Sequence, residues 1–289
     1  MAYMTRNRNE QDAQTASSPF GYANQVAPPF AQPVVTQLPL VISLPLLLHQ
    51  PLAEPNWIVP GLLPVGVSLL AGPAQVDKPL LANQLGLSVA TGTPFLHRFP
   101  VRQGRVLYLA LAESRVHVRG RAINLLNNQH SPEAFHVAFQ WSPFRQGGLA
   151  DLEDTLAQLE GPRLVIVDPL EFVQPLRGDN AGYGYRARQF TTPEAALSFF
   201  VPLHELATRY DLAMLLLHHL SDDWPNSRRD PLAGLSPTGL TAVSACNLLL
   251  TTRADIHACE LHYAGVHVAE HRLRLTYDNA RGEWREELG

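Results

Sequence analysis

Apolar and polar residues alternate along the chain with two different periods from about residue 67 onward. Short apolar runs predict buried strands, and apolar residues at helical spacing predict helices. The predicted strands span residues 67–71, 105–110, 135–139, 163–167 and 212–217, and the predicted helices span residues 78–91, 116–127, 149–159 and 193–209. Because strands alternate with helices, the pattern predicts a mostly parallel central sheet with helices on both faces.

The C-terminal part of the chain departs from this alternation. Three strand-like segments follow one another without helices between them, at residues 247–252, 261–268 and 273–277. Antiparallel strands added to the edge of the sheet would explain this pattern. We therefore predict an α/β fold with a mostly parallel central sheet and antiparallel C-terminal edge strands.

The N-terminal part is predicted to be a separate region. Residues 1–55 form a disordered, Pro-rich N-terminal arm, and residues 56–289 form the α/β domain. The first 36 residues are rich in Gln, Asn, Ser and Pro, which is typical of disorder. The apolar segment that follows is too hydrophobic to remain exposed to solvent, so we expect it to pack on its own domain or on a neighbouring subunit.

Composition limits the classes of function. The chain has 289 residues, 46% apolar content and a net charge of −4, so it lacks a global basic field for nucleic acid. Nucleic-acid contact would have to come from local arginine clusters. The sequence has three such clusters: Arg115, Arg119 and Arg121; Arg228 and Arg229; Arg272 and Arg274. Two distant cysteines, a polar N-terminus and no long apolar run predict a cytoplasmic protein without a membrane segment.

The segment from Val67 to Leu80 organises the domain. A predicted strand leads into a turn at Gly72, and a predicted helix begins at Lys78. This layout follows the P-loop pattern G-x-x-x-x-G-K-[ST], in which backbone N–H groups and the lysine bind phosphate. Gly72 and Lys78 have the required separation. Asp77, however, takes the place of the second glycine, and Pro79 takes the place of the residue that binds Mg²⁺.

Both departures oppose nucleotide binding. Pro79 removes the hydroxyl and one N–H group. Asp77 adds a carboxylate where phosphate would bind, and two like charges about 4 Å apart repel by roughly 4 kcal/mol at an effective dielectric constant of about 20. Asp-Lys-Pro is also an ordinary helix start, with Asp77 as the cap and Pro79 in the first turn. Against this, Lys78 is the only lysine in the chain, which favours a retained phosphate contact or a pocket too tight for arginine.

Two acidic residues follow predicted strands. Asp168 ends an apolar strand about 90 residues after the loop, where a carboxylate can orient Mg²⁺-bound water; a strand-terminal turn residue is the alternative. Glu113 also follows a strand and could act as a general base, or it could be a surface turn residue.

A different set of residues could bind nucleic acid. Tyr183, Tyr185, Arg186 and Arg188 interleave aromatic and cationic groups in a loop with glycines, which suits stacking and phosphate contact; a loop without such contacts is the alternative. The His- and Cys-containing stretch at residues 257–271 matches no compact zinc pattern, so we predict no metal site there.

Taken together, the motifs resemble those of RecA-like hexameric ATPases of the RepA plasmid-helicase type. The resemblance covers about residues 57–285. Its matching segments are residues 57–64, 69–73 with Lys78, 85–91, 104–113, 164–170, 215–219 and 239–245. It implies a RecA-like three-layer fold, assembly into a ring or filament, ATP between subunits and work on DNA.

The resemblance also implies roles for single residues. Lys78 would contact phosphate, Glu113 would be the catalytic base and Asp168 the Mg²⁺ partner. His218 or His219 would sense the terminal phosphate. Because of the departures at Asp77 and Pro79, the leading hypothesis is a pseudo-ATPase without cofactor. It would act as a binding or scaffold protein in DNA replication, repair or recombination, assembling with itself or with an active relative.

Two other hypotheses stay open. The first is an active DNA-dependent ATPase or helicase that uses ATP and Mg²⁺ through an unusual P-loop. The second is a regulator in which the inactive site serves only as a surface for a partner. Single-stranded DNA is the expected polymer under the leading hypothesis, with Arg228 and Arg229 as further contacts.

Overall fold

The computed structural model describes residues 41–51, 55–174, 193–220, 232, 235, 243–252 and 258–287. The chain divides into two compact units, Met1–Leu52 and Ala53–Gly289. The described part of the first unit contains the short helix α1 (Leu44–His49), which has no buried residue. No described helix is long and apolar enough to cross a membrane.

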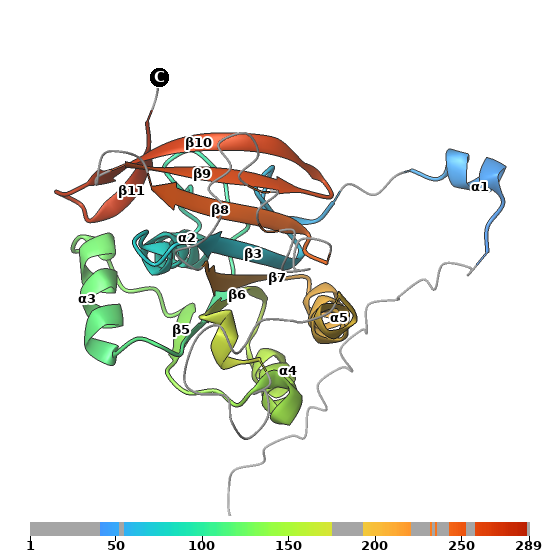
Figure 1. Cartoon of the computed structure of the whole chain (residues 1–289), viewed down its shortest axis with the longest axis horizontal. Coiled ribbons are helices and arrows are strands. Elements are labelled where there is room, and N and C mark those ends of the chain that lie inside the picture. The colour runs from blue at the N-terminus through green and yellow to red at the C-terminus, as the bar shows by residue number, and fades with distance from the viewer. Residues whose placement is uncertain are drawn as a thin grey trace, which may run out of the picture. The chain divides into compact units, whose positions relative to one another are not determined.

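The residues that the structure describes form a nine-stranded sheet at the centre of the second unit (Figure 1). Its spatial order is β11-β10-β9-β8-β3-β7-β6-β4-β5. The bounds are β3 (Gly66–Gly72), β4 (Arg105–Ala110), β5 (Phe135–Ala138), β6 (Pro162–Asp168), β7 (Ala213–His219), β8 (Cys246–Thr252), β9 (Ala258–Gly265), β10 (Val268–Asp278) and β11 (Glu283–Glu286). The strands from β8 to β5 pair in parallel, and β8 to β11 pair antiparallel. The predicted sheet is confirmed.

Helices cover both faces of the parallel part of the sheet (Figure 1). One face packs against α2 (Lys78–Thr91) and α3 (Arg115–Leu126), and the other against α4 (Gly148–Gln158) and α5 (Pro193–Arg209). Strands such as β6 are therefore buried on both faces, which explains their uninterrupted apolar sequence. The α/β class is confirmed.

Several boundaries correct the predictions. The strand predicted at residues 261–268 crosses the turn between β9 and β10, where Val266 is 75% exposed. A Cβ atom at Gly265 would lie 2.2 Å from the backbone oxygen of Ala245, so β9 ends where only glycine fits. The pattern missed β11, whose sequence Glu-Trp-Arg-Glu is mainly charged. It also missed α1 and the small hairpin of β1 (Trp57–Val59) and β2 (Leu63–Pro64).

Candidate functional site

The loop between β3 and α2 has the predicted strand–turn–helix form. β3 ends at Gly72 and α2 begins at Lys78. A Cβ atom at Gly72 would lie 2.5 Å from the carbonyl oxygen of Leu250 on the neighbouring strand β8. Close packing of the two backbones therefore requires glycine at this position.

Asp77 is the N-cap of α2, as predicted. Its Oδ1 accepts a hydrogen bond from the backbone N–H of Leu80 at 2.9 Å. The backbone at Asp77 (φ −76°, ψ 73°) forms an inverse γ-turn, in which the N–H of Lys78 donates to the carbonyl oxygen of Val76 at 2.8 Å. Pro79 has no N–H group. The first turn of α2 therefore directs no free N–H group from positions 78–80 toward a phosphate.

Lys78 binds the loop itself. Its ammonium Nζ donates to the carbonyl oxygens of Gly72 and Pro73, each at 2.8 Å, and the residue is fully buried. Burial lowers the pKa of Lys78 to about 8, although the negative charges of Asp168, Glu171 and Asp77 oppose the shift. The positive charge that a P-loop lysine would offer to phosphate is thus turned toward backbone oxygens.

Glu113 is held by an arginine from α3. The guanidinium of Arg121 donates to both carboxylate oxygens of Glu113 at 2.7 Å, and it lies 3.8 Å from Asp77 Oδ1. Burial alone would raise the pKa of Glu113, but the hydrogen bonds and charge of Arg121 lower it. The carboxylate is therefore ionised and bound on both oxygens.

Asp168 lies at the end of β6 and shares a tyrosine with Glu113. The Tyr108 hydroxyl oxygen is 2.6 Å from Asp168 Oδ2 and 3.0 Å from Glu113 Oε2. One hydroxyl hydrogen can be donated to only one of the two carboxyl groups. Burial raises the pKa of Asp168 to about 6, although the hydrogen bond from Tyr108 opposes the shift.

Sequence reasoning missed Tyr108 and Arg121 as members of this site. The only signal for Tyr108 was a hydroxyl-bearing residue inside an otherwise aliphatic strand. The sequence groups Arg121 with Arg115 and Arg119, but the structure separates it from the other two. Arg121 turns inward, whereas the guanidinium of Arg115 lies over the ring of Phe139, 5.4 Å from its centroid.

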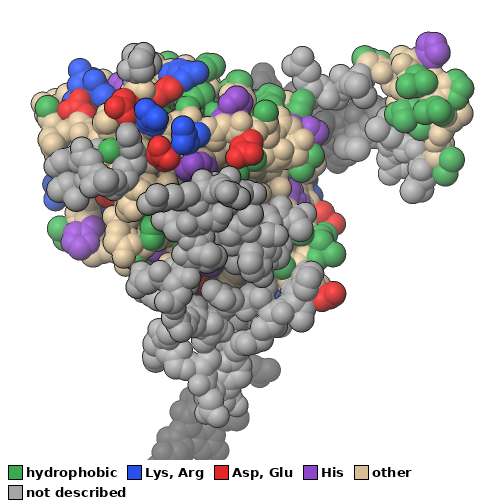
Figure 2. Space-filling model, turned by 45° about the horizontal axis from the view of Figure 1, so that its top comes forward, with side chains coloured by type: hydrophobic (Ala, Val, Ile, Leu, Met, Phe, Trp, Pro, Cys, Tyr) green, Lys and Arg blue, Asp and Glu red, His purple; other side chains and the backbone are tan. Residues whose placement is uncertain are grey.

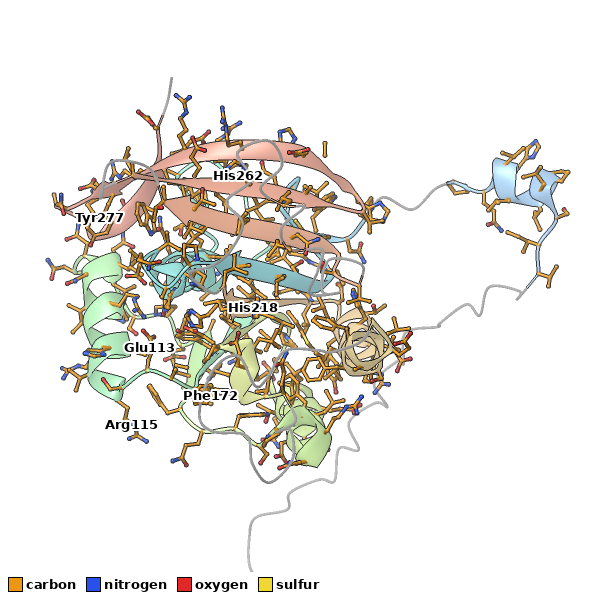
Figure 3. All side chains as sticks on the ribbon, in the orientation of Figure 1. Glu113, Arg115, Phe172, His218, His262 and Tyr277 are labelled. Carbon is orange, nitrogen blue, oxygen red and sulfur yellow. The ribbon has the colours of Figure 1, made fainter. Side chains whose placement is uncertain are left out.

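His218 and His219 lie at the end of β7 and face opposite sides of the sheet, because side chains alternate along a strand. His218 is buried, and its Nδ1 is 2.6 Å from Glu171 Oε1 (His218 is labelled in Figure 3). The backbone N–H of His219 donates to the same oxygen at 3.2 Å. Burial and the charge of Lys78 lower the pKa of His219. His219 shares a face of β7 with Leu215 and Leu217, which pack in the core cluster of α2, so it is the member of the pair on the P-loop face.

The predicted nucleic-acid residues lie outside the described part of the chain. These residues are Tyr183, Tyr185, Arg186, Arg188, Arg228 and Arg229. Arg272 and Arg274 are described, and each lies 3.9 Å from Glu260. Figure 2 shows positive and negative side chains interspersed over the C-terminal strands, so the described part of this surface is not a continuous basic track. No group of three potential metal-binding side chains occurs among the residues that the structure describes.

A strand, a loop of fixed length, a lysine at the start of a helix and a carboxylate ending a neighbouring parallel strand define a P-loop type of α/β protein. The chain belongs to the AAA domain family, whose sequence profile matches residues 39–223. Its structure is similar to the crystal structure of the RadB recombinase, with 14% identity and a TM-score of 0.53. The match covers 78% of this chain and 93% of that one. No curated protein matches the sequence.

The likeness to RadB confirms the predicted RecA-like P-loop ATPase fold. Because the two sequences are only 14% identical, the likeness shows the fold alone. Membership of the RepA plasmid-helicase type therefore remains a prediction.

Proposed function

We propose that this chain is a RecA-like pseudo-ATPase that acts as a binding or scaffold protein in DNA replication, repair or recombination. It assembles with itself or with an active relative, to which the apolar N-terminal arm helps to tether it. ATP and Mg²⁺ are not part of this function.

The observation that carries the proposal is the internal pairing of the groups that would bind nucleotide. Asp77 caps the helix that would bind phosphate, Lys78 binds two loop carbonyl oxygens, and Arg121 binds both oxygens of Glu113. ATP would have to replace all these contacts and lie beside the carboxylate of Asp77. Pro79 offers no hydroxyl to Mg²⁺, which would otherwise offset the negative charge.

The DNA-related role rests on the family and the fold. Membership of the AAA domain family and the likeness to a recombinase support a place in DNA metabolism. Tyr183, Tyr185, Arg186, Arg188, Arg228 and Arg229 are the proposed contacts to single-stranded DNA. Fluorescence anisotropy with an oligothymidine and an oligouridine of equal length would test this, using paired Tyr→Ala and Arg→Gln variants. Light scattering after gel filtration would measure self-assembly.

The central test is equilibrium titration of ATP with and without Mg²⁺. We expect no Mg²⁺-dependent binding by the wild type, and no difference between the wild type and Lys78→Ala. Mg²⁺-dependent binding that Lys78→Ala abolishes would overturn the pseudo-ATPase proposal.

A variant with a restored P-loop sequence tests whether changes in the loop alone prevent ATP binding or whether the rest of the site has also lost the ability to bind it. Asp77→Gly with Pro79→Ser returns the P-loop pattern, and Arg121→Ala frees Glu113. We expect the triple variant to bind ATP with Mg²⁺, because it removes one carboxylate, restores a hydroxyl and an N–H group, and opens the pairing of Glu113. Failure of the triple variant to bind would place the loss outside these three positions.

The active ATPase is the second candidate. It is favoured by the convergence of Lys78, Glu113 and Asp168, since Tyr108 joins the two carboxyl groups and the charge of Asp168 acts on Lys78. Under this reading Arg121 would leave Glu113 when nucleotide and DNA bind. DNA-stimulated phosphate release that Glu113→Gln abolishes would establish it.

A further inference from the structure

The guanidinium of Arg121 lies between two carboxylates of the P-loop site. Its Nη1 and Nη2 donate to the two carboxylate oxygens of Glu113, each at 2.7 Å, and Nη2 is 3.8 Å from Asp77 Oδ1. The side chains of Arg121 and Glu113 are each only 15% exposed. A positive charge of the protein itself is therefore enclosed among acidic groups that come from the starts of α2 and α3.

This positive charge is permanent. Burial opposes it, but the hydrogen bonds to Glu113 and the negative charges of Glu113 and Asp77 raise the pKa of Arg121. An arginine side chain keeps its proton in proteins. The charge also acts on a third carboxyl group: burial raises the pKa of Asp168, and the charge of Arg121 opposes that rise. Arg121 thus serves as a counterion to the whole acidic side of the site.

A divalent cation would need the same carboxylates. Mg²⁺ is usually bound by one or two carboxylates together with water. The described residues bring no three potential metal-binding side chains together, so Glu113 and Asp77 would be its protein ligands. Their oxygens cannot bind a metal ion while they bind the guanidinium, and two cations at one place repel each other. Arginine and metal ion therefore exclude each other here.

The other basic residues nearby do not take this position. The guanidinium of Arg115 lies over the ring of Phe139, and Arg119 lines the groove between α3 and β5. Lys78 donates to carbonyl oxygens of its own loop. Among the three arginines of α3, Arg121 alone contacts the acidic residues of the site.

We propose that Arg121 takes the place of the divalent cation at this site. Its guanidinium compensates Glu113 and Asp77 from within the chain, so the folded protein excludes Mg²⁺ even without nucleotide. A planar, permanently charged fork fits a carboxylate on both oxygens, which suits this role. The inference deepens the proposed function and rests on it, because it names the group that fills the place of the metal ion.

The test is titration of the full chain with Tb³⁺ in the absence of nucleotide, measured by luminescence that excitation of tyrosine sensitises. Tb³⁺ prefers oxygen ligands, as Mg²⁺ does, and the Tyr108 hydroxyl is 3.0 Å from Glu113 Oε2, close enough to transfer energy to an ion there. We expect Arg121→Gln to bind Tb³⁺ at least about tenfold more tightly than the wild type, because two carboxylates lose their counterion. Excess Mg²⁺ should displace Tb³⁺ from this variant.

Three further variants locate the bound ion. Arg119→Gln removes the same charge from the same helix but away from the carboxylates, so it should bind Tb³⁺ as weakly as the wild type. Arg121→Lys keeps a positive charge and should gain less affinity than Arg121→Gln. Adding Glu113→Gln to Arg121→Gln should abolish the gain, because a ligand is lost.

Thermal melting keeps the proposal testable if Arg121→Gln is unstable. A cation that binds the folded state alone raises the melting temperature. Mg²⁺ should therefore raise the melting temperature of Arg121→Gln and leave that of the wild type unchanged. A variant that Mg²⁺ does not stabilise would contradict the proposal.

The proposal is overturned if the wild type and Arg121→Gln bind Tb³⁺ equally well, if Arg119→Gln gains as much affinity, or if adding Glu113→Gln leaves the gain unchanged. None of these measurements contains ATP. Mg²⁺-dependent ATP binding by the wild type, in contrast, would overturn the proposed function, so the two failures can be told apart.

Discussion

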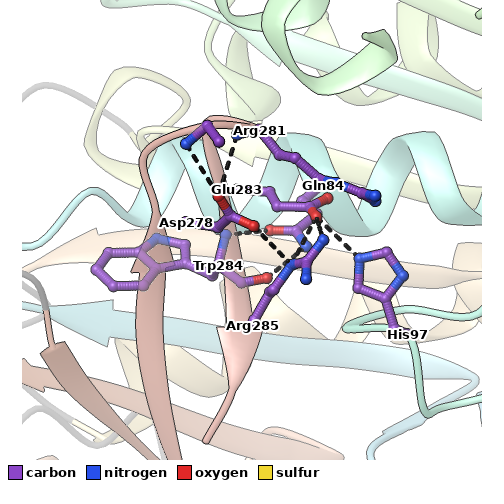
Figure 4. Close-up of polar contacts among 8 residues, drawn as sticks. Gln84, His97, Asp278, Arg281, Glu283, Trp284 and Arg285 are labelled. Atoms are coloured by element: carbon purple, nitrogen blue, oxygen red, sulfur yellow. Dashed lines mark hydrogen bonds and ion pairs between the residues drawn. The ribbon is translucent and has the colours of Figure 1, made fainter.

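At its N-terminal end α2 meets a loop whose polar groups bind one another, whereas further along it is joined to β11, a strand 200 residues away in the chain, by the hydrogen bonds between Gln84 and Trp284 (Figure 4). Lys78 donates to the carbonyl oxygens of Gly72 and Pro73, and Asp77 accepts from Leu80, so both form their hydrogen bonds within residues 72–80. The helix therefore joins a site that resembles a nucleotide site but is filled by protein groups to a contact with β11 that no sequence motif marks.

The difference shows that a motif and a site are separate properties. The P-loop end keeps the layout of phosphate binding, yet its groups stabilise the fold. No motif marks the contact of α2 with β11, because its two residues, Gln84 and Trp284, are 200 positions apart in the chain. Each of the variants below changes residues at the P-loop, in its neighbouring site or at the contact of α2 with β11.

The largest effect is expected at the P-loop end. In Gly72→Ala the new Cβ atom would meet the Leu250 carbonyl oxygen at 2.5 Å, and neither backbone can move without disturbing the paired strands. We expect a loss of about 4 kcal/mol in the free energy of unfolding. Gly120→Ala in α3 is the control, because no atom lies within 4 Å of its added Cβ. It should stabilise the protein by about 1 kcal/mol. Urea denaturation measures both, and equal effects would contradict the tight approach of β3 and β8.

A slightly smaller effect is expected at the far end. Gln84→Leu removes both hydrogen bonds to the Trp284 backbone and leaves an N–H and a C=O group without partners. We expect a loss of about 3 kcal/mol. Gln103→Leu makes the same change at an exposed residue with one long hydrogen bond of 3.4 Å, so it should cost less than about 0.5 kcal/mol. Equal losses in the two variants would mean that β11 does not depend on Gln84.

The burial of Asp168 predicts a pH dependence of stability. The pKa of Asp168 rises from 3.8 in the unfolded chain to about 6 in the folded protein. The folded state therefore binds the proton more tightly, so this stabilisation is full below the unfolded pKa and is lost as the pH rises through the folded pKa. Between pH 4 and pH 7.5 the loss amounts to about 2 kcal/mol.

Asp168→Asn tests this pH dependence, since the amide donates to Tyr108 without titrating. Relative to the wild type, the variant should gain about 2 kcal/mol between pH 4 and pH 7.5 when unfolding is measured by guanidinium denaturation. Other titrating groups cancel in the comparison. Parallel stability curves for the two proteins would show that folding does not raise the pKa of Asp168.

The sequence predicted the parts of the site that depend on neighbours in the chain. Asp77 caps α2 by accepting a hydrogen bond from the backbone of a residue three positions away. The pattern of apolar runs located β3 and α2. The pairing of Glu113 with Arg121 needs the position of α3 beside the loop, which no local pattern contains. Tyr108 joins two carboxyl groups 55 residues apart in the chain only because β4 and β6 are adjacent.

The smallest effect separates the capping role of Asp77 from its charge. Asn is as good an N-cap as Asp, so Asp77→Asn should change the free energy of unfolding by less than about 0.5 kcal/mol, whereas Asp77→Ala should lose about 1 kcal/mol. Both variants remove the same negative charge from the P-loop. If Asp77→Asn binds ATP with Mg²⁺ and the wild type does not, charge alone closes the site. If neither variant binds, the contacts of Lys78 and the missing groups of Pro79 are enough to close it.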